Sequence, residues 1–329
     1  MKTVLGVEGG GSHSHAVLAA PSGEVLGFGM NDDSANWEDV GLPAASAAIR
    51  SCVMEALGAA ALEASAVAAS AFGLAGIDFA IDEQRLSGIP MALGLTGPCS
   101  LVNDAFVALR AGTDQSYGVV VVAGTGSVVA GRNPAGKVFR TLGLGPTFGD
   151  AGSGTEISQA GVSAVAAEFI GKGPATMLTQ VLCERTKSRS VADLLEGAAR
   201  GRIDDSLFAP FVIEAAKQGD QASCRILDDA GERIGVNAVH VIRTLGMEDL
   251  AFDLVLAGGM FRGGNHLFVE AVGHVVRPAA PNSTFVALDA PPVVGAVLLS
   301  MDGIGDELGP EMRGELTRAT AIAVGVPAG

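Results

Sequence analysis

The chain has 329 residues, of which 48% are hydrophobic and 17% are charged. This composition is typical of a globular protein with a large core, and the length suits two domains; a disordered chain is excluded. The net charge of −15, with no cluster of Lys and Arg, argues against nucleic acid as a partner.

The cysteines and the apolar segments indicate the cellular location of the protein. The four cysteines are far apart and form no CxxC pair, which is typical of reduced thiols in a cytoplasmic protein. No cleavable apolar leader follows Met1, and the apolar segment 56–76 contains Glu63. We interpret that segment as a helix and a strand rather than a membrane span. We therefore expect a cytoplasmic protein with no membrane partner.

Hydrophobic periodicity and turn residues predict strands that alternate with helices along the chain. The expected strands, besides those of the repeat described below, span residues 67–74, 100–103, 254–257 and 285–288. The expected helices span residues 43–62, 81–87, 155–170, 292–300 and 310–324, with more helices between 170 and 245. Such alternation predicts an α/β fold.

One supersecondary unit occurs twice: strand, glycine turn, strand, Pro-x-Gly turn, strand. The first copy has strands at 4–7, 16–19 and 24–27, with Glu8-Gly9-Gly10-Gly11-Ser12 in its glycine turn. The second has strands at 118–122, 128–130 and 137–140, with Gly124-Thr125-Gly126-Ser127 in its turn. Chance similarity of glycine hairpins is the alternative, but a true repeat would open each of two domains.

The two glycine turns are candidates for phosphate binding. Backbone N–H groups in such a turn can approach phosphate oxygens without side-chain obstruction. Neither turn matches GxxxxGK[ST], or GxGxxG before a helix. Because each turn lies between strands, no helix dipole is expected to help.

Three polar residues in turns or at strand ends could carry chemistry. Asp104 follows a predicted strand and could accept a hydroxyl proton or hold a metal through water; equally, it could cap the helix that follows. Asp150, in a glycine-rich loop, could bind a ligand hydroxyl or Mg²⁺, or serve as a turn residue. Asn36 could contact ligand or form an Asx-turn.

His13 and His15 alternate on one face near the first turn. The sequence shows no cysteine or carboxylate at ligand spacing from them, so this pair does not predict a metal centre.

Taken together, these motifs resemble the sugar-kinase branch of the actin-like ATPases, with the N-acetylglucosamine kinases and BadF/BadG-type ATPases as the nearest groups. Residues 8–12 resemble the first phosphate motif and residues 124–127 the second. Residues 256–259 resemble the adenosine motif, and residues 149–153 a Gly-Asp-Glu-Gly-Ser loop. The resemblance covers nearly the whole chain.

This resemblance implies two ribonuclease-H-like domains that flank a cleft, one at 1–108 with a returning helix at about 310–325, the other at 109–309. It implies an ATP- and Mg²⁺-dependent kinase acting on the 6-hydroxyl of an amino sugar, and a homodimer. Asp104 would be the base. The sugar would be bound by Asn36, Gly76, Asn103, Asp104, Thr125 and Asp150. ATP would be bound by Gly10, Gly11, Ser12, His13, Thr125, Gly126, Ser127, Gly258 and Gly259, and Glu8 would meet the metal through water.

Four residues depart from the family pattern. Glu8 replaces an Asp, His13 a Lys or Arg, Ala151 a Glu, and Val128 an Asn that is frequent in sugar kinases. Three other activities therefore stay open: a glucosamine or other sugar kinase, a BadF-type ATPase, and a catalytically weak sugar sensor. A DNA-binding repressor is disfavoured because no helix-turn-helix precedes Val4.

Overall fold

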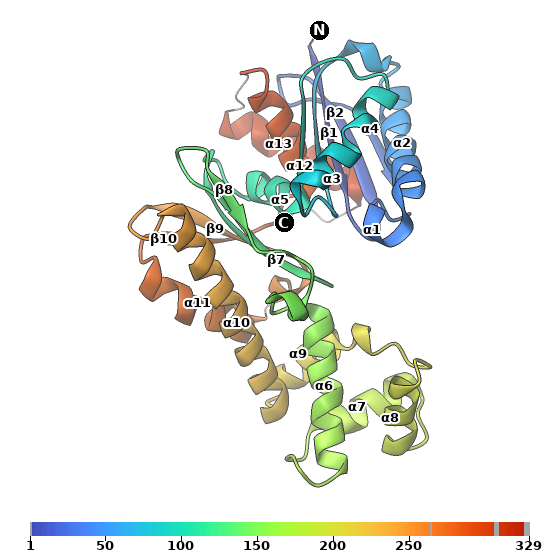
Figure 1. Cartoon of the computed structure of the whole chain (residues 1–329), viewed down its shortest axis with the longest axis vertical. Helices are drawn as coiled ribbons and strands as arrows, with labels where there is room; N and C mark the ends of the chain where they lie inside the picture. The colour runs from blue at the N-terminus through green and yellow to red at the C-terminus, as the bar shows by residue number, and fades with distance from the viewer. Residues whose placement is uncertain (1, 264, 306–308, 326–329) are drawn as a thin grey trace. The chain divides into compact units, whose positions relative to one another are not determined.

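The computed structural model describes residues 2–263, 265–305 and 309–325. It contains two compact units: one comprises the chain up to Val120 together with the chain from Val286 onward, and the other comprises Val121–Phe285. Each unit is an α/β structure with one five-stranded mixed sheet (Figure 1). The expected α/β fold is confirmed.

The first unit is built on a sheet of order β3-β2-β1-β4-β5. Strand β1 pairs antiparallel with β2 and parallel with β4, which in turn pairs parallel with β5. The strands are β1 (Thr3–Gly9), β2 (Ser14–Ala19), β3 (Val25–Asn31), β4 (Val67–Leu74) and β5 (Cys99–Asn103).

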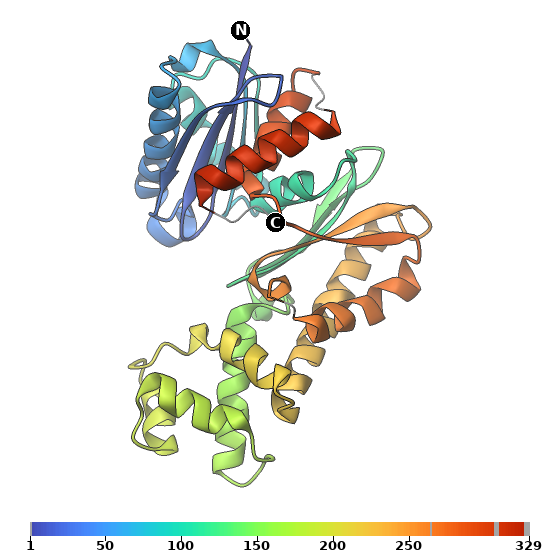
Figure 2. The ribbon, with the colours of Figure 1, turned by 180° about the vertical axis from the view of Figure 1, so that it is seen from behind.

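Helices cover both faces of this sheet. Successive residues of β1 point to opposite faces, so Leu5 packs in the cluster under α2, whereas Val4 packs in the cluster under α12 and α13. Figures 1 and 2 show α2 on one face and α13 on the other. The helices of this unit are α1 (Trp37–Val40), α2 (Leu42–Ala59), η1 (Ala64–Ala66), α3 (Ala80–Leu86), α4 (Gly88–Ala92), α5 (Asp104–Gly112), α12 (Pro292–Asp302) and α13 (Pro310–Val324).

Helix α12 lies against β1 and α5 through two glycines. A Cβ atom on Gly6 would lie 2.4 Å from the Val297 nitrogen, and one on Gly295 would lie 1.9 Å from the Val107 carbonyl oxygen. The hydroxyl of Ser300 also donates to the Leu5 carbonyl at 2.7 Å. This close packing places α12 in the first unit, whereas the sequence-based boundary had assigned 109–309 to the second domain.

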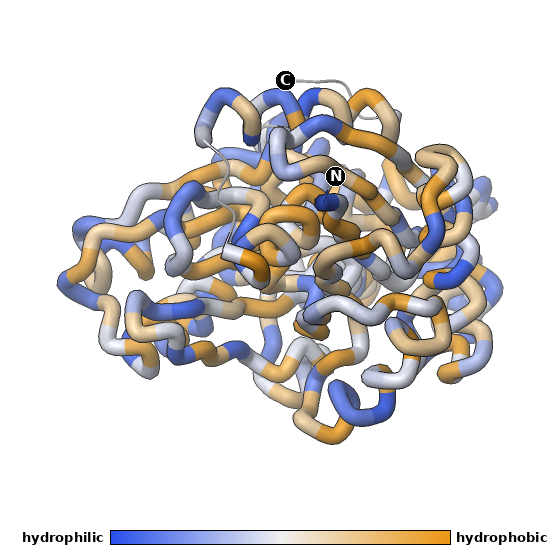
Figure 3. The backbone as a smooth tube through the Cα atoms, turned by 90° about the horizontal axis from the view of Figure 1, so that it is seen from above, coloured by the Kyte–Doolittle hydropathy of each residue, from blue (hydrophilic) through white to orange (hydrophobic). Residues whose placement is uncertain are grey.

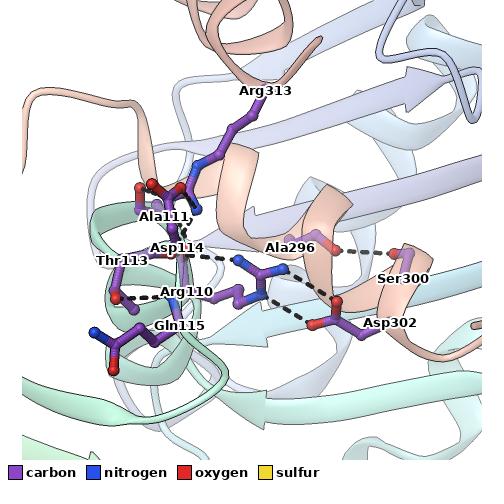
Figure 4. A network of polar contacts seen from close by, with 9 residues as sticks. All are labelled: Arg110, Ala111, Thr113, Asp114, Gln115, Ala296, Ser300, Asp302 and Arg313. Atoms are coloured by element: carbon purple, nitrogen blue, oxygen red, sulfur yellow. Dashed lines mark hydrogen bonds and ion pairs between the residues drawn. The ribbon is translucent and has the colours of Figure 1, made fainter. Parts of the chain in front are cut away.

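A polar network ties the end of α5 to the C-terminal helices (Figure 4). The Arg110 guanidinium forms a bidentate pair with Asp302, with N–O distances of 2.9 and 3.1 Å. Arg313 of α13 donates to the carbonyl oxygens of Arg110, Ala111 and Thr113 and to the Asp114 carboxylate. Arg313 therefore binds carbonyls that the end of α5 leaves without an intrahelical partner.

The second unit has a sheet of order β10-β9-β6-β7-β8. Read from β8, this is the order of the first sheet with each strand replaced by its counterpart, which confirms the internal repeat. The strands are β6 (Gly118–Ala123), β7 (Ser127–Arg132), β8 (Val138–Arg140), β9 (Phe252–Ala257) and β10 (Ser283–Ala287).

Helices dominate the rest of the second unit. The long helix α10 packs against α11 (Figure 1) and begins at a cap, Asp220, whose carboxylate accepts four hydrogen bonds from Thr176, Met177 and Ser223. The helices are η2 (Pro146–Phe148), α6 (Gly154–Phe169), α7 (Met177–Thr186), α8 (Val191–Ala199), η3 (Asp205–Leu207), α9 (Ala209–Lys217), α10 (Gln221–Leu245), η4 (Gly259–Phe261) and α11 (His266–Ala279).

Hydrophilic and hydrophobic residues are interspersed along the chain (Figure 3). Within the described ranges, no helix combines the length and the apolar character needed to span a membrane. The apolar segment 56–76 is the end of α2 followed by β4, as expected.

Candidate functional site

The parallel strands of the first unit bring three loops to one edge of the sheet. Gly9 at the end of β1 pairs with Leu74 at the end of β4, and Leu74 pairs with Asn103 at the end of β5. The glycine turn, the loop at Gly76 and the start of α5 therefore leave the sheet at the same level. Ligands of α/β sheets bind beyond the carboxyl ends of the strands.

The first glycine turn closes a tight hairpin, with the Gly10 amide donating to the His13 carbonyl at 3.0 Å. Glu8 and His15 face each other across β1 and β2 and are both buried. The Glu8 Oε2 atom lies 3.2 Å from His15 Nδ1 and 4.0 Å from His13 Nε2. A carboxylate thus lies at ligand spacing from both histidines, and the expectation that the sequence offered none was wrong.

Asn36 and Gly76 lie together at this edge. Asn36 caps the short helix α1 by accepting from the Glu38 amide at 3.2 Å, and the indole of Trp37 donates to the Gly76 carbonyl at 2.7 Å. Gly76 has φ +79°, and a Cβ there would lie 2.5 Å from Asn36 Oδ1. Only glycine fits at this position, both in conformation and in space.

Asn103 is the N-cap of α5, and Asp104 is the first residue of the helix. The Asn103 side chain is the helix cap, accepting from the Ala105 amide at 3.1 Å, and its amide donates to Asp78 Oδ1 at 3.2 Å. Asp104 is the first residue of the helix and is half-buried. The capping role considered for Asp104 therefore belongs to its neighbour.

Acidic side chains surround this edge. Burial, followed by the negative charges of Asp78 and Asp82, raises the pKa of Glu38. Asp82 is itself buried and is paired with Arg85 at 3.0 Å, and Arg85 stacks over the Trp37 ring. A carboxylate placed beside Glu38 would therefore meet charges of its own sign.

In the second unit, the turn between β6 and β7 lies against the start of α6. The amide of Gly154 donates to the Gly124 carbonyl at 2.7 Å, and the Thr155 amide donates to the Thr125 carbonyl at 3.3 Å. Sequence order alone suggested a turn remote from any helix N-terminus, and this was wrong. The first helical amides are engaged by the turn, but the positive end of the helix dipole lies beside it.

Gly258 lies against the same turn, and it differs from its neighbour Gly259 in what the fold requires. Gly258 has φ +98°, and a Cβ there would lie 2.3 Å from the Ala123 carbonyl oxygen, so the fold requires a glycine. Gly259 has an ordinary φ, and a Cβ there would meet nothing within 4 Å.

Four turn glycines resemble Gly259, because neither φ nor crowding explains them. A Cβ on Gly124 or Gly126 would meet nothing within 4 Å, and one on Gly10 or Gly11 would have its nearest neighbour beyond 3.6 Å. The fold would accept alanine at these positions. What glycine preserves there is open space above the backbone, as a bound phosphate requires.

Asp150 is buried and holds its own loop. Its Oδ2 atom accepts from the amides of Leu144 at 2.7 Å and Gly145 at 3.0 Å. Its Oδ1 atom is buried without a hydrogen-bond partner among the described residues. Asp150 therefore stabilises its own turn through Oδ2, and Oδ1 remains to accept a hydrogen bond from a ligand.

Sequence reasoning missed two contacts in these clusters, one between Glu8 and His15 and one between Asn103 and Asp78. His15 was noticed but not connected to Glu8; the pairing follows from the hairpin register once the strands are extended to Gly9 and Ser14. Asp78 binds Asn103 from a loop 25 residues away, a contact for which the sequence carries no local signal.

Residues 5–300 match the BadF/BadG/BcrA/BcrD ATPase family. The chain belongs to this family. It is 30% identical over 277 residues to the N-acetylmuramic acid/N-acetylglucosamine kinase of Clostridium acetobutylicum, covering 82% of this chain and 89% of that one. It is 30% identical over 312 residues to the N-acetyl-D-glucosamine kinase of Dictyostelium discoideum, covering 91% and 97%.

Solved structures confirm the fold of this family member. A candidate N-acetylglucosamine kinase from Chromobacterium violaceum superimposes with a TM-score of 0.67 at 23% identity, covering 91% of this chain and 99% of that one. A ROK family glucokinase from Streptomyces griseus superimposes with a TM-score of 0.58 at 16% identity, covering 91% and 99%. The two-sheet α/β fold is therefore shared with these sugar kinases.

Proposed function

We propose that this BadF/BadG-type protein transfers the terminal phosphoryl group of ATP to the 6-hydroxyl of N-acetylglucosamine, with Asp104 as general base. The coarser activity, ATP-dependent phosphorylation of a sugar, follows from the family and the two kinase relatives. The observation that carries the proposal is the shared register of Gly9, Leu74 and Asn103. It brings a glycine turn, the loop at Gly76 and an aspartate to one edge of the sheet.

Asp104 suits the role of general base. It is the first residue of α5 and follows the carboxyl end of β5, where ligands of α/β sheets bind. Because Asn103 supplies the cap, Asp104 is not needed to begin the helix. General-base assistance contributes roughly 10²–10⁴-fold to a rate, and most of the remaining acceleration in phosphoryl transfer comes from positioning and charge stabilisation.

Each unit has a glycine turn that is a candidate for binding ATP phosphates, Gly10–His13 in the first unit and Thr125–Ser127 in the second, and Gly258 and Gly259 of the second unit are candidates for contact with adenosine. Mg²⁺ fits this assignment, because the buried Glu8 carboxylate beside the first turn is the oxygen donor that this ion prefers. Bound Mg²⁺ would neutralise phosphate charge, and Glu8 would hold one of its waters.

Each unit, taken by itself, offers polar groups that suit a sugar. In the first unit these are the Asn36 side chain, the Gly76 loop and Asn103 beside Asp104. In the second they are Thr125 and Asp150, whose Oδ1 has no partner among the described residues and would accept a hydrogen bond from a sugar hydroxyl. The acids around Asn36 favour a neutral sugar over N-acetylmuramic acid, whose lactyl group carries a carboxylate.

The test is ADP release from Mg·ATP with N-acetylglucosamine, N-acetylmuramic acid, glucosamine, N-acetylmannosamine, glucose or no sugar. We expect strong stimulation by N-acetylglucosamine and little by N-acetylmuramic acid. The position of the new phosphate is then assigned by phosphorus–proton NMR of the product. A rate of ATP hydrolysis that is the same with and without each sugar would instead indicate a BadF-type ATPase. ATP binding without turnover would indicate a sugar sensor.

Glucosamine is the second candidate substrate. The acidic surroundings of Asn36 would favour its ammonium group, and Ala151 and Val128 stand where the resemblance leads one to expect Glu and Asn. A higher kcat/KM for glucosamine than for N-acetylglucosamine would identify glucosamine as the substrate. The homodimer and the cytoplasmic location stay predictions.

A further inference from the structure

The β1–β2 hairpin gathers three metal-ligating side chains at its turn. Glu8, His13 and His15 each offer one ligand atom, and these atoms all lie within 4.8 Å of one another. Glu8 and His15 are buried, and the His13 side chain is 47% exposed. The hairpin register fixes the group, because Glu8 faces His15 across the two strands.

The distances approach those of a coordination sphere. Metal–ligand bonds of about 2.0–2.2 Å in a tetrahedron separate ligand atoms by about 3.4 Å. Glu8 Oε2 and His15 Nδ1 are already 3.2 Å apart, and His13 Nε2 lies 4.0 Å from the same oxygen. Closing the sphere requires a movement of about 1 Å by the half-exposed His13 ring.

A neighbouring hydroxyl holds His13 in a suitable orientation. Ser12 Oγ lies 3.0 Å from His13 Nδ1, which leaves Nε2 directed toward Glu8. A hydrogen bond to the second ring nitrogen is the usual partner of a metal-bound histidine, because it fixes the ring and the tautomer.

The donor set distinguishes between metal ions. Two imidazoles and one carboxylate suit Zn²⁺ and neighbouring d-block ions, whereas Mg²⁺ takes oxygen ligands and retains water. We propose that Glu8, His13 and His15 form a three-ligand site for a d-block divalent cation, Zn²⁺ foremost, with water in the remaining position. This site shares Glu8 and His13 with the proposed ATP-binding turn, but metal binding to the ATP-free protein tests it without the sugar-kinase activity.

The experiment titrates the metal-free full-length protein with Co²⁺ and then displaces it with Zn²⁺. We expect one saturable site whose visible d–d absorption lacks thiolate charge transfer, since none of the ligands is a cysteine. Millimolar Mg²⁺ should leave the Co²⁺ spectrum unchanged. Isothermal titration with ZnCl₂ gives the affinity, and circular dichroism checks each variant for folding.

The variants are His13→Gln and Glu8→Gln, with His274→Gln, exposed on α11, as matched control. Loss of an outer-shell partner alone costs about 10–100-fold in affinity, so removal of a ligand should weaken Zn²⁺ binding at least that much. The control should bind as the wild type does. Absence of a saturable site, equal affinity in His13→Gln, thiolate absorption or displacement by Mg²⁺ would each overturn the proposal. His13→Gln keeps the test decisive if Glu8→Gln misfolds.

Discussion

Asn103, rather than the proposed base Asp104, caps α5, and its side-chain amide also donates to Asp78. Replacement of Asp104 should therefore leave this cap in place. At the turn glycines Gly124, Gly126 and Gly259, the backbone would accept a side chain. At these glycines, the effects of a mutation on ligand binding and on stability can be separated.

The first prediction concerns the proposed base. Asp104→Asn should lower kcat by about a hundredfold or more, within the general-base range, while ATP binding and thermal stability stay close to wild type. Steady-state ADP release and ATP titration measure the two effects. Asp33→Asn, exposed on the same unit, is the matched control. Near-normal kcat in Asp104→Asn would remove this residue as base.

The second prediction separates two kinds of glycine. Gly126→Ala should fold normally yet weaken ATP binding by at least about 1.4 kcal/mol, or tenfold in Kd, because its methyl group enters the space above the turn. Gly258→Ala should instead destabilise the protein by about 1–3 kcal/mol through strain at positive φ. Calorimetric melting and ATP titration distinguish the outcomes.

Gly58→Ala is the control for this pair. Gly58 lies exposed in α2 with open space around it, so alanine should stabilise the helix by about 0.5–1 kcal/mol and leave ATP binding alone. If Gly126→Ala bound ATP as tightly as Gly58→Ala does, the turn would not be a phosphate site.

At the scale of the elements, the N-cap of α10, Asp220, also binds the start of α7. Burial alone would raise the pKa of Asp220, but hydrogen bonds from Met177, Ser223 and Thr176 hold that pKa below its usual value of 3.8. The charged cap thus joins the starts of α7 and α10.

The third prediction follows from this cap. Asp220→Asn should lower the free energy of unfolding at neutral pH by about 1–3 kcal/mol, from weakened capping and charged hydrogen bonds. Because the folded pKa is depressed, the contribution is present above pH 3.8 and disappears as the pH falls through the folded pKa. Urea unfolding of wild type and variant from pH 7 to 3 should show the two curves converging. A constant difference would mean that the charge is irrelevant.

Elements were easier to predict than their ends. The helices at 292–300 and 310–324 were expected almost as they occur, the first from its small apolar residues and the second from a proline at the first helical position. The first two strands were drawn too short, at 4–7 and 16–19, since only their apolar centres give a signal. The polar ends, Glu8 and His15, join the strands through backbone pairing that hydrophobicity does not reveal.

At the scale of the whole molecule, the sheet of the first unit is completed by helices from the other end of the chain. Its sheet is covered on one face by α12 and α13, and Arg313 binds the carbonyl oxygens at the end of α5. The repeat predicted both sheets, because each copy carries its own turn signals. The boundary at 309 was wrong because close packing of Gly6 and Gly295 is a contact between remote segments, which periodicity does not encode.

The fourth prediction tests this closure. Arg313→Met should destabilise the first unit by about 1.5–3 kcal/mol, the range for hydrogen bonds from a charged group. Arg318→Met, exposed on the same helix, should change the melting temperature little. Hydrogen exchange should show faster exchange in α5 and α13 of the Arg313 variant. Equal melting temperatures of the two variants would contradict a structural role for the network in Figure 4.

The discontinuous first unit has a consequence for synthesis on the ribosome. Domains commonly complete their folding in the order in which they emerge. Here the N-terminal sheet emerges first, but the helix that fills the groove at Gly6 is translated only after Val286, when the chain of the second unit is already finished. The second unit is thus the first that can complete its core. During that interval, the apolar sheet face that α12 later covers is without its packing partner.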